Sequence, residues 1–233
     1  MNDLTPPLRS LSHVTDWVFD LDNTLYPRTC NLLAQIDLRI TNYVMDLTKL
    51  DFVAARDLQK SYYRDFGTTL NGLMQQHNVD AEHFLDTVHA IDYSPVEPHP
   101  ELVNAISLLP GRKFVLTNGD TKHARSVLEK LGGPHLFEHV HDIRAMTYVP
   151  KPHRAAYEGF FALHGIDPTH AAMFDDLEKN LVVPHGMGMV TVHVVAPSGF
   201  AHEQVEAWEL GRSGAPHVHH VTDNLVEFLG NRP

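Results

Sequence analysis

The fold is decided by the stretch Val14-Thr15-Asp16-Trp17-Val18-Phe19-Asp20-Leu21-Asp22-Asn23-Thr24. Its first seven residues are mainly β-branched or aromatic, a pattern typical of a buried strand over residues 14–20. The strand ends at Asp20, and Asp22 follows two residues later, so both carboxylates can project toward the same side of the chain. Ligands of open parallel sheets bind at the carboxyl ends of the strands. The stretch therefore predicts a core strand that ends in a functional site.

Strands and helices alternate along most of the remaining chain. Further strands are expected at residues 113–117, 139–143, 171–174 and 189–195. Helical spacing of apolar residues covers 100–109, 124–131 and the segment between Pro152 and Gly165, and a short helix is expected around 203–210. This alternation implies a parallel sheet with helices on both faces. The predicted fold class is α/β, with a Rossmann-like parallel sheet as the core.

One region breaks the alternation, because it contains helical patterns only. Apolar residues between Leu32 and Leu47 follow helical spacing. Three more helices are expected, each after a residue suited to an N-cap: Asp51, Thr68 or Thr69, and Asp80. The proline-rich residues 94–100 form a stiff return linker. We therefore expect a core domain of residues 13–26 and 95–233, and an inserted α-helical domain of residues 27–94.

Composition and charge exclude several classes of protein. The 233 residues are 43% hydrophobic and 20% charged, as in ordinary globular proteins. The net charge of −11 disfavours binding to nucleic acid or to an anionic membrane. No apolar run approaches the roughly 20 residues of a membrane span. The single cysteine, Cys30, excludes an internal disulfide framework and favours a reducing compartment, so we expect a cytoplasmic protein.

The 18 histidines are scattered and show no convincing zinc-binding pattern. His217, His219 and His220 lie in an alternating run that is more typical of a strand than of a metal site. The carboxylates are more informative. Two acids as close as Asp20 and Asp22 repel each other, which raises the pKa of one and leaves the other ionised. That combination suits a nucleophile beside a general acid.

Three more segments carry chemistry at the ends of predicted strands or the starts of helices. Thr117-Asn118-Gly119 offers a hydroxyl and turn amides for phosphate oxygens. Lys151, before Pro152, can neutralise phosphate charge and anchor an aspartate nucleophile. Asp175 and Asp176 add to the first two acids the oxygen-rich surroundings that Mg²⁺ prefers. Their common placement on one side of the sheet predicts a single site.

Together these segments resemble the four motifs of the haloacid dehalogenase superfamily. The residues concerned are 19–27 (Phe-Asp-Leu-Asp-Asn-Thr-Leu-Tyr-Pro), 117–119, 151–152 and 174–176 with Asn180. The helical insert resembles the α-helical cap of one subclass. Residues 23–27 and the stretch 61–73 are similar to the pyrimidine 5′-nucleotidase branch. The resemblance covers roughly residues 14–195 and implies the fold predicted above.

The resemblance also assigns roles. Asp20 matches the nucleophile that forms an aspartyl-phosphate. Asp22 matches the acid that protonates the leaving oxygen and then activates water, and its backbone carbonyl matches a metal ligand. Thr117 and Lys151 match phosphate-binding groups, with Asn118 nearby. Asp176 matches the acid that binds Mg²⁺, with Asp175 as a direct or indirect partner. Asn180 stands where some relatives have another acid.

The implied activity is Mg²⁺-dependent hydrolysis of a phosphomonoester, with nucleoside 5′-monophosphates as the first choice of substrate. Asp22 argues against dehalogenation, since the dehalogenases of the superfamily lack this acid. The alternatives are a phosphatase of sugar or organic-acid phosphates, a phosphomutase, and an inactive phosphate-binding module, against which the intact motifs speak. Tyr62, Tyr63 and Phe66 would either stack on a base or pack the insert. We expect a monomer or homodimer whose partner is a small phosphorylated metabolite.

Overall fold

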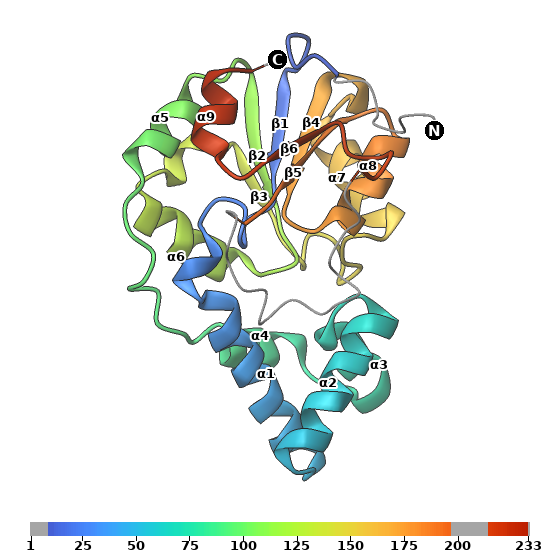
Figure 1. The fold of residues 1–233 in the computed structure, drawn as a ribbon. Helices are drawn as coiled ribbons and strands as arrows, with labels where there is room; N and C mark the ends of the chain where they lie inside the picture. The colour runs from blue at the N-terminus through green and yellow to red at the C-terminus, as the bar shows by residue number, and fades with distance from the viewer. Residues whose placement is uncertain (1–8, 197–213, 233) are drawn as a thin grey trace.

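The core of the protein is one parallel sheet of six strands. The computed structural model describes residues 9–196 and 214–232. Its strands are β1 (Asp16–Phe19), β2 (Arg112–Leu116), β3 (His139–His141), β4 (Ala171–Asp175), β5 (Val190–Val194) and β6 (His220–Thr222). They lie in the order β3-β2-β1-β4-β5-β6 (Figure 1). The prediction of an α/β fold with a parallel sheet is confirmed.

Helices cover both faces of this sheet, as apolar strands without polar alternation require. One face packs against α5 (Pro100–Ser107), α6 (Thr121–Leu131) and α9 (Leu225–Gly230), and the other against α7 (Arg154–His164) and α8 (Val182–Gly186) (Figure 1). Trp17 and Phe19 of β1 belong to the first hydrophobic layer, while Val18 between them belongs to the second. All three are fully buried, so β1 is the centre of the core.

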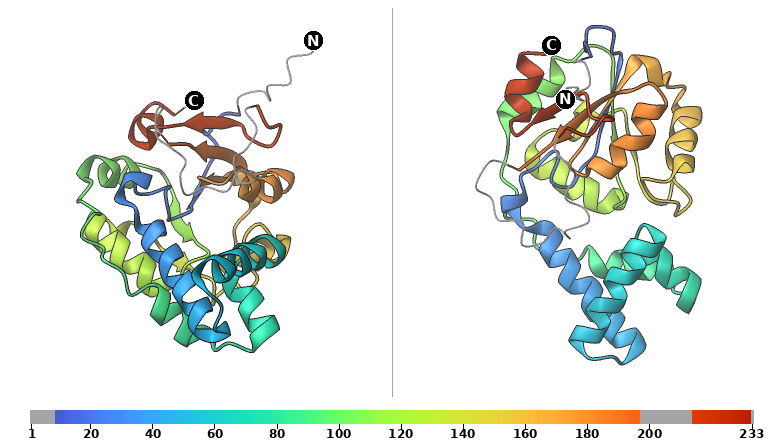
Figure 2. Two further views of the ribbon diagram at one scale, coloured as in Figure 1. Left: turned by 60° about the horizontal axis from the view of Figure 1, so that its bottom comes forward. Right: turned by 45° about the vertical axis from the view of Figure 1, so that its right-hand side comes forward.

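The four helices between β1 and α5 form a separate layer, here called the helical insert. They are α1 (Leu32–Thr48), α2 (Phe52–Phe66), α3 (Thr69–His77) and α4 (Ala81–Val88). Asp51, Thr68 and Asp80 accept hydrogen bonds from backbone N–H groups of α2, α3 and α4, as expected for N-caps. The insert lies beyond the carboxyl ends of the strands (Figures 1 and 2). It thus faces the edge of the sheet where the motif residues emerge.

The sequence-based expectations differ from the structure near the C-terminus. The alternating histidine run forms a strand only from His220, and His217 lies before it. The expected helix around 203–210 falls outside the described residues. Within residues 9–196 and 214–232, no helix has the length and apolar character needed to cross a membrane.

Candidate active site

Three neighbouring strands bring the motif residues together. In the sheet register, Phe19 of β1 pairs with Val115 of β2 and with Phe174 of β4. The residues that follow these positions therefore emerge side by side at the carboxyl edge of the sheet. They include Asp20, whose backbone N–H donates to the Phe174 carbonyl over 2.8 Å, and Thr117. The predicted convergence of separate strand ends follows directly from the strand order.

Lys151 joins the nucleophile candidate to the second acidic segment. Its Nζ donates to Asp20 Oδ1 and to Asp175 Oδ2, both over 2.7 Å. The lysine side chain is buried. Burial alone would lower the pKa of Lys151, but the carboxylates of Asp175 and Asp20 outweigh it and raise that pKa. The ammonium group therefore stays charged and fixes the carboxylate of Asp20.

Asp175 is held by hydrogen bonds on both of its oxygens. In addition to Lys151 at Oδ2, the Leu177 backbone N–H and the Asn180 side-chain amide donate to Oδ1, each over 2.9 Å. Asn180 thus has a clear structural role, which is to orient Asp175. Because both oxygens are engaged, Asp175 is better suited to hold Lys151 in place than to bind a metal directly.

Asp176 completes a cluster of three carboxylates with Asp20 and Asp175, in which one oxygen of each lies within 4.8 Å of the others. Arg28 Nη2 donates to Asp176 Oδ2 over 2.6 Å, and the Asn23 amide donates to the same oxygen over 3.3 Å. Burial and the charge of Asp175 nevertheless raise the pKa of Asp176 to about 7. The cluster is buried, rich in oxygen and short of positive charge, which fits a divalent cation such as Mg²⁺.

Asp22 points to a different set of partners. The Tyr26 hydroxyl donates to Asp22 Oδ1 over 2.5 Å, and His123 Nε2 lies 2.7 Å from the same oxygen. Burial would raise the pKa of Asp22, but the charge and hydrogen bond of His123 outweigh it and lower that pKa. The pKa of His123 is raised in return: burial opposes this shift, but the Asp22 carboxylate outweighs it.

The pKa values of the two acids are shifted in opposite directions, and the raised one is that of Asp20. Burial raises the pKa of Asp20 well above its usual value, and the charges of Asp175 and Asp176 add to this against the opposing charge of Lys151. Asp22 instead has a lowered pKa. Repulsion predicts that one pKa of the pair is raised, and the surroundings of each acid decide which one.

The Thr117-Asn118-Gly119 segment lies between these groups. The Thr117 hydroxyl accepts from the Gly119 backbone N–H over 2.9 Å. The Asn118 side chain exchanges two hydrogen bonds with the backbone of Lys151, over 3.1 and 2.8 Å. The predicted phosphate contact of Asn118 would thus come from its backbone. A Cβ at Gly119 would lie only 3.2 Å from the His123 ring, so glycine permits the close approach of α6.

A cavity of about 270 Å³ connects the motif residues with the helical insert. Its floor includes six of the predicted site residues: Asp20, Asp22, Thr117, Asn118, Lys151 and Asp176. Its roof comes from all four helices of the insert and is mainly apolar, with Leu33, Ile36, Ile40, Leu70, Phe84, Leu85 and Val88. A smaller polar group on the roof consists of Asp37, Gln59 and Lys60, in which Asp37 accepts from both others.

The three aromatic residues expected either to stack on a base or to pack the insert have different positions. Tyr63 lines the cavity, and Lys179 Nζ lies 4.5 Å from its ring centroid. Tyr62 contacts Phe66 edge-on and its hydroxyl lies 2.8 Å from His77 Nε2, so both rings pack α2 against α3. Only Tyr63 of the three lines the cavity.

Several site residues carry no recognisable signal in the sequence. Arg28 binds Asp176 across 148 positions, and His123 lies beside Asp22 across 101 positions. Tyr26 stands within the first motif, but its contact with Asp22 depends on the turn that follows β1. The histidines 217 and 219 make ordinary polar contacts instead, with Glu178 and Thr191.

Acids at adjacent strand ends, with a buried lysine between two of them, define the site of an α/β protein with a carboxylate nucleophile candidate. Residues 18–181 match the haloacid dehalogenase-like hydrolase family, and the chain belongs to it. A curated relative is Phosphate metabolism protein 8 of Saccharomyces cerevisiae, which is 25% identical over 207 residues. The match covers 80% of this chain and 64% of the length of the yeast protein.

Solved structures agree in fold at low sequence identity. L-2-haloacid dehalogenase from Xanthobacter autotrophicus has a TM-score of 0.57 and is 15% identical, with 93% of this chain and 97% of that chain covered. The HAD-hydrolase YfnB from Bacillus subtilis, bound to magnesium, has a TM-score of 0.54 and is 12% identical, with 93% and 97% covered. At these identities the likeness supports the shared fold and leaves the reaction to be argued from the site.

Proposed function

We propose that the chain is a Mg²⁺-dependent phosphomonoesterase that acts on nucleoside 5′-monophosphates, with Asp20 as its nucleophile. The observation that carries the proposal is the shared cavity of Asp20, Asp22, Thr117, Lys151 and Asp176. A phosphoryl group in this cavity would meet a carboxylate, a buried ammonium, a hydroxyl and a second acid. These are the parts that stepwise phosphoryl transfer through a carboxylate requires.

The metal would be held by Asp20, Asp176 and the backbone carbonyl of Asp22. Burial and neighbouring carboxylates raise the pKa of Asp20 and of Asp176 although Lys151 and Arg28 contact them, so the three carboxylates can accommodate a further positive charge. A bound Mg²⁺ supplies that charge and reduces the repulsion between the carboxylate and the phosphate. The magnesium bound to the Bacillus subtilis HAD-hydrolase supports this choice of ion.

The chain's own residues can then perform two half-reactions. The ionised form of Asp20 attacks phosphorus while the bond to the leaving oxygen breaks, and the protonated form of Asp22 gives that oxygen its proton. In the second half, a water molecule attacks the phosphorus of the aspartyl-phosphate and Asp22 takes its proton. The bond between phosphorus and Asp20 breaks, which frees inorganic phosphate. Lys151 holds Asp20 in position throughout.

The substrate class is supported by the roof of the cavity. Its apolar surface and Tyr63 can accommodate a base, because an aromatic side chain stacks on planar groups. One observation favours a second candidate, a sugar or organic-acid phosphate: Asp37, Gln59 and Lys60 could bind hydroxyl groups. Under both alternatives the helical insert acts as a cap that excludes water and selects the leaving group.

A phosphate-release panel tests the proposal. It compares UMP, CMP, dUMP, AMP, GMP, sugar phosphates, phosphoglycolate and p-nitrophenyl phosphate, with Mg²⁺ and with chelator, and includes 2-chloropropionate for halide release. We expect Mg²⁺-dependent phosphate release, a preference for pyrimidine nucleotides and no halide. Release of halide, or no phosphate from any ester, would contradict the proposal. A preference for sugar phosphates would favour the second candidate.

A further inference from the structure

The two oxygens of Asp22 have unequal surroundings. Oδ1 accepts from the Tyr26 hydroxyl over 2.5 Å and lies 2.7 Å from His123 Nε2. Oδ2 takes part in none of the hydrogen bonds found among the described residues. It faces the phosphate-binding segment instead, because a Cβ at Gly119 would lie 3.7 Å from Oδ2 and 3.3 Å from the Thr117 hydroxyl. Each carboxylate oxygen has two lone pairs, and those of Oδ1 accept from the Tyr26 hydroxyl and from the Nε2–H of the protonated His123 ring, a form that the raised pKa of His123 favours.

The ring of His123 is fixed from several directions. The Tyr93 hydroxyl donates its one hydrogen to the backbone carbonyl of His89 over 3.0 Å. It can therefore only accept from His123 Nδ1, which lies 3.0 Å away. The ring of His89 stacks on that of His123, with centroids 4.7 Å apart and an angle of 16° between the planes. The buried ring thus has one orientation, with Nε2 toward Asp22.

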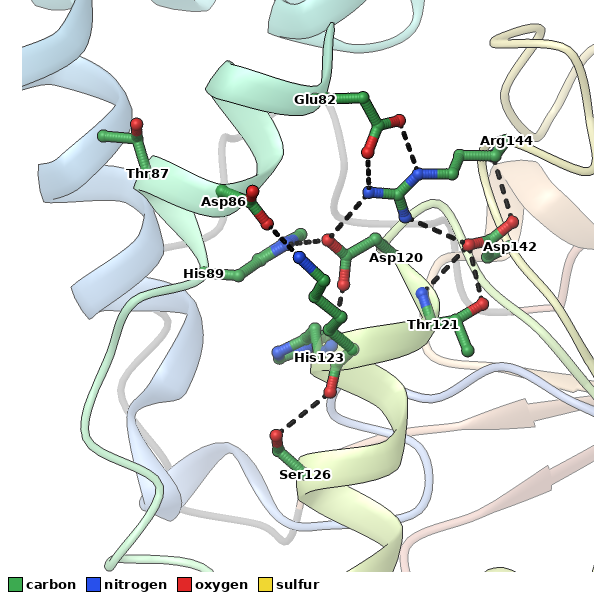
Figure 3. Close-up of polar contacts among 12 residues, drawn as sticks. Glu82, Asp86, Thr87, His89, Asp120, Thr121, His123, Ser126, Asp142 and Arg144 are labelled. Atoms are coloured by element: carbon green, nitrogen blue, oxygen red, sulfur yellow. Dashed lines mark hydrogen bonds and ion pairs between the residues drawn. The ribbon is translucent and has the colours of Figure 1, made fainter.

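The supports of His123 come from both domains. Asp120 is the N-cap of α6 and accepts from the His123 backbone N–H over 2.7 Å. Its other oxygen lies 3.2 Å from His89 Nδ1 and 3.6 Å from Arg144 Nη2 (Figure 3). Arg144 in turn forms two hydrogen bonds with Glu82 of α4, over 2.6 and 2.7 Å. His89 and Tyr93 belong to the segment that returns from the insert.

We propose that His123 is a positioning residue for Asp22. His123 holds Oδ1 of Asp22, so that Oδ2 is the oxygen presented to the substrate. This inference rests on the proposed phosphatase function. A proton taken up by Asp22 would go to Oδ2, because the lone pairs of Oδ1 are occupied. From Oδ2 it passes to the leaving oxygen as the bond to phosphorus breaks. His123 itself does not touch the substrate.

The test uses the dependence of general-acid catalysis on the leaving group. An alkoxide needs a proton to leave, whereas p-nitrophenolate does not. General-acid catalysis contributes 10²–10⁴-fold, so we expect His123→Leu to lower kcat/KM about 30-fold for the best alkyl phosphate of the panel and less than about threefold for p-nitrophenyl phosphate. His123→Gln keeps an N–H donor that can reach Asp22 and should recover most of the alkyl phosphate activity.

Further variants separate positioning from general damage to the fold. His123→Asn keeps a polar group near Tyr93 but is too short to reach Asp22, and it replaces His123→Leu if that variant does not fold. His220→Leu removes another buried histidine, whose ring contacts the Arg9 carbonyl far along the chain, and serves as a matched control. Equal losses of kcat/KM on both substrates, or no loss on either, would overturn the positioning role of His123 but not the proposed function. No phosphate release by the wild-type protein would overturn the proposed function, and this inference with it.

Discussion

The floor and the roof of the cavity are built on different principles. The floor consists mainly of polar and charged groups at the ends of three adjacent strands, with Lys151 from the loop before α7, and short hydrogen bonds fix them, such as those of Lys151 to Asp20 and Asp175. The roof consists mainly of apolar side chains from the helical insert. The floor can therefore specify the reaction, because it fixes charged groups in place. The roof can select among leaving groups, because it offers shape and apolar surface.

Substitution at the floor should have the largest effect. Asp20→Asn removes the nucleophile, and we expect the Mg²⁺-dependent turnover of every ester in the panel to fall by a factor on the order of 10⁴ or more, since the covalent path is lost. Phosphate release measures it. Asp16→Asn is the matched control at the opposite end of β1, where Asp16 pairs with Arg112 over 2.7 Å. Substantial residual activity in Asp20→Asn would assign the nucleophile to another group.

The same floor should show competition between protons and metal. Because the pKa of Asp176 is raised to about 7, protonation of this ligand opposes Mg²⁺ binding at lower pH. The apparent affinity for Mg²⁺ should therefore weaken roughly tenfold per pH unit below about pH 7 and level off above it. Titration calorimetry at several pH values measures this directly. An affinity independent of pH between about 5.5 and about 8 would contradict this competition between protons and metal at Asp176.

Substitution at the roof should change selectivity and leave the chemistry intact. We expect Tyr63→Ala to alter the preference among nucleotides about tenfold, with little change for p-nitrophenyl phosphate, because only contacts to the leaving group are lost. Ratios of kcat/KM provide the measurement. Tyr62→Ala is the control, since its ring packs against Phe66 and it should lower stability without altering selectivity. Unchanged discrimination in Tyr63→Ala would remove Tyr63 from substrate recognition.

The contact of Asp120 with His89 and Arg144, which joins the core to the helical insert, should have the smallest effect on turnover. Its loss should lower stability instead. Burial would raise the pKa of Asp120, but His89, the His123 backbone and Arg144 together lower it to about 2. A lowered carboxylate pKa adds stability above the unfolded-state value, and this contribution is lost as pH falls. Asp120→Asn keeps an N-cap acceptor but should lower the free energy of unfolding at pH 6 by roughly 2 kcal/mol.

Urea unfolding of both proteins measures the difference, which should shrink as the pH falls below about 4 because Asp120 then takes up a proton in the unfolded state but not yet in the folded state. A difference that stays constant down to pH 3, which lies roughly midway between the folded and unfolded pKa values, would mean that the charge of Asp120 does not stabilise the contact.

The floor was more predictable from the sequence than the roof. Apolar runs that end in acids specify strands and their carboxyl ends, and the strand order then places Asp20, Thr117 and Asp176 together. Hydrogen bonds over long separations leave no such pattern, so the contacts of Arg28 with Asp176 and of His123 with Asp22 could not be foreseen. Repulsion between the two acids predicts that one of their pKa values is raised, but which one depends on neighbours that the sequence does not reveal. On the roof, helical spacing alone could not predict that Tyr63 lines the cavity while Tyr62 packs within the insert.

The central claim is that Asp20 becomes phosphorylated, and trapping that intermediate tests it most directly. In Asp22→Asn with p-nitrophenyl phosphate, the first half-reaction needs no acid while the second lacks its base. A rapid-quench experiment should show a burst of p-nitrophenolate close to the enzyme concentration. Peptide mapping after borohydride reduction should find residue 20 converted to homoserine. The contrary result, given a wild-type protein that is an active phosphatase, is slow linear release of p-nitrophenolate by Asp22→Asn with residue 20 unmodified. It would contradict the phosphorylation of Asp20.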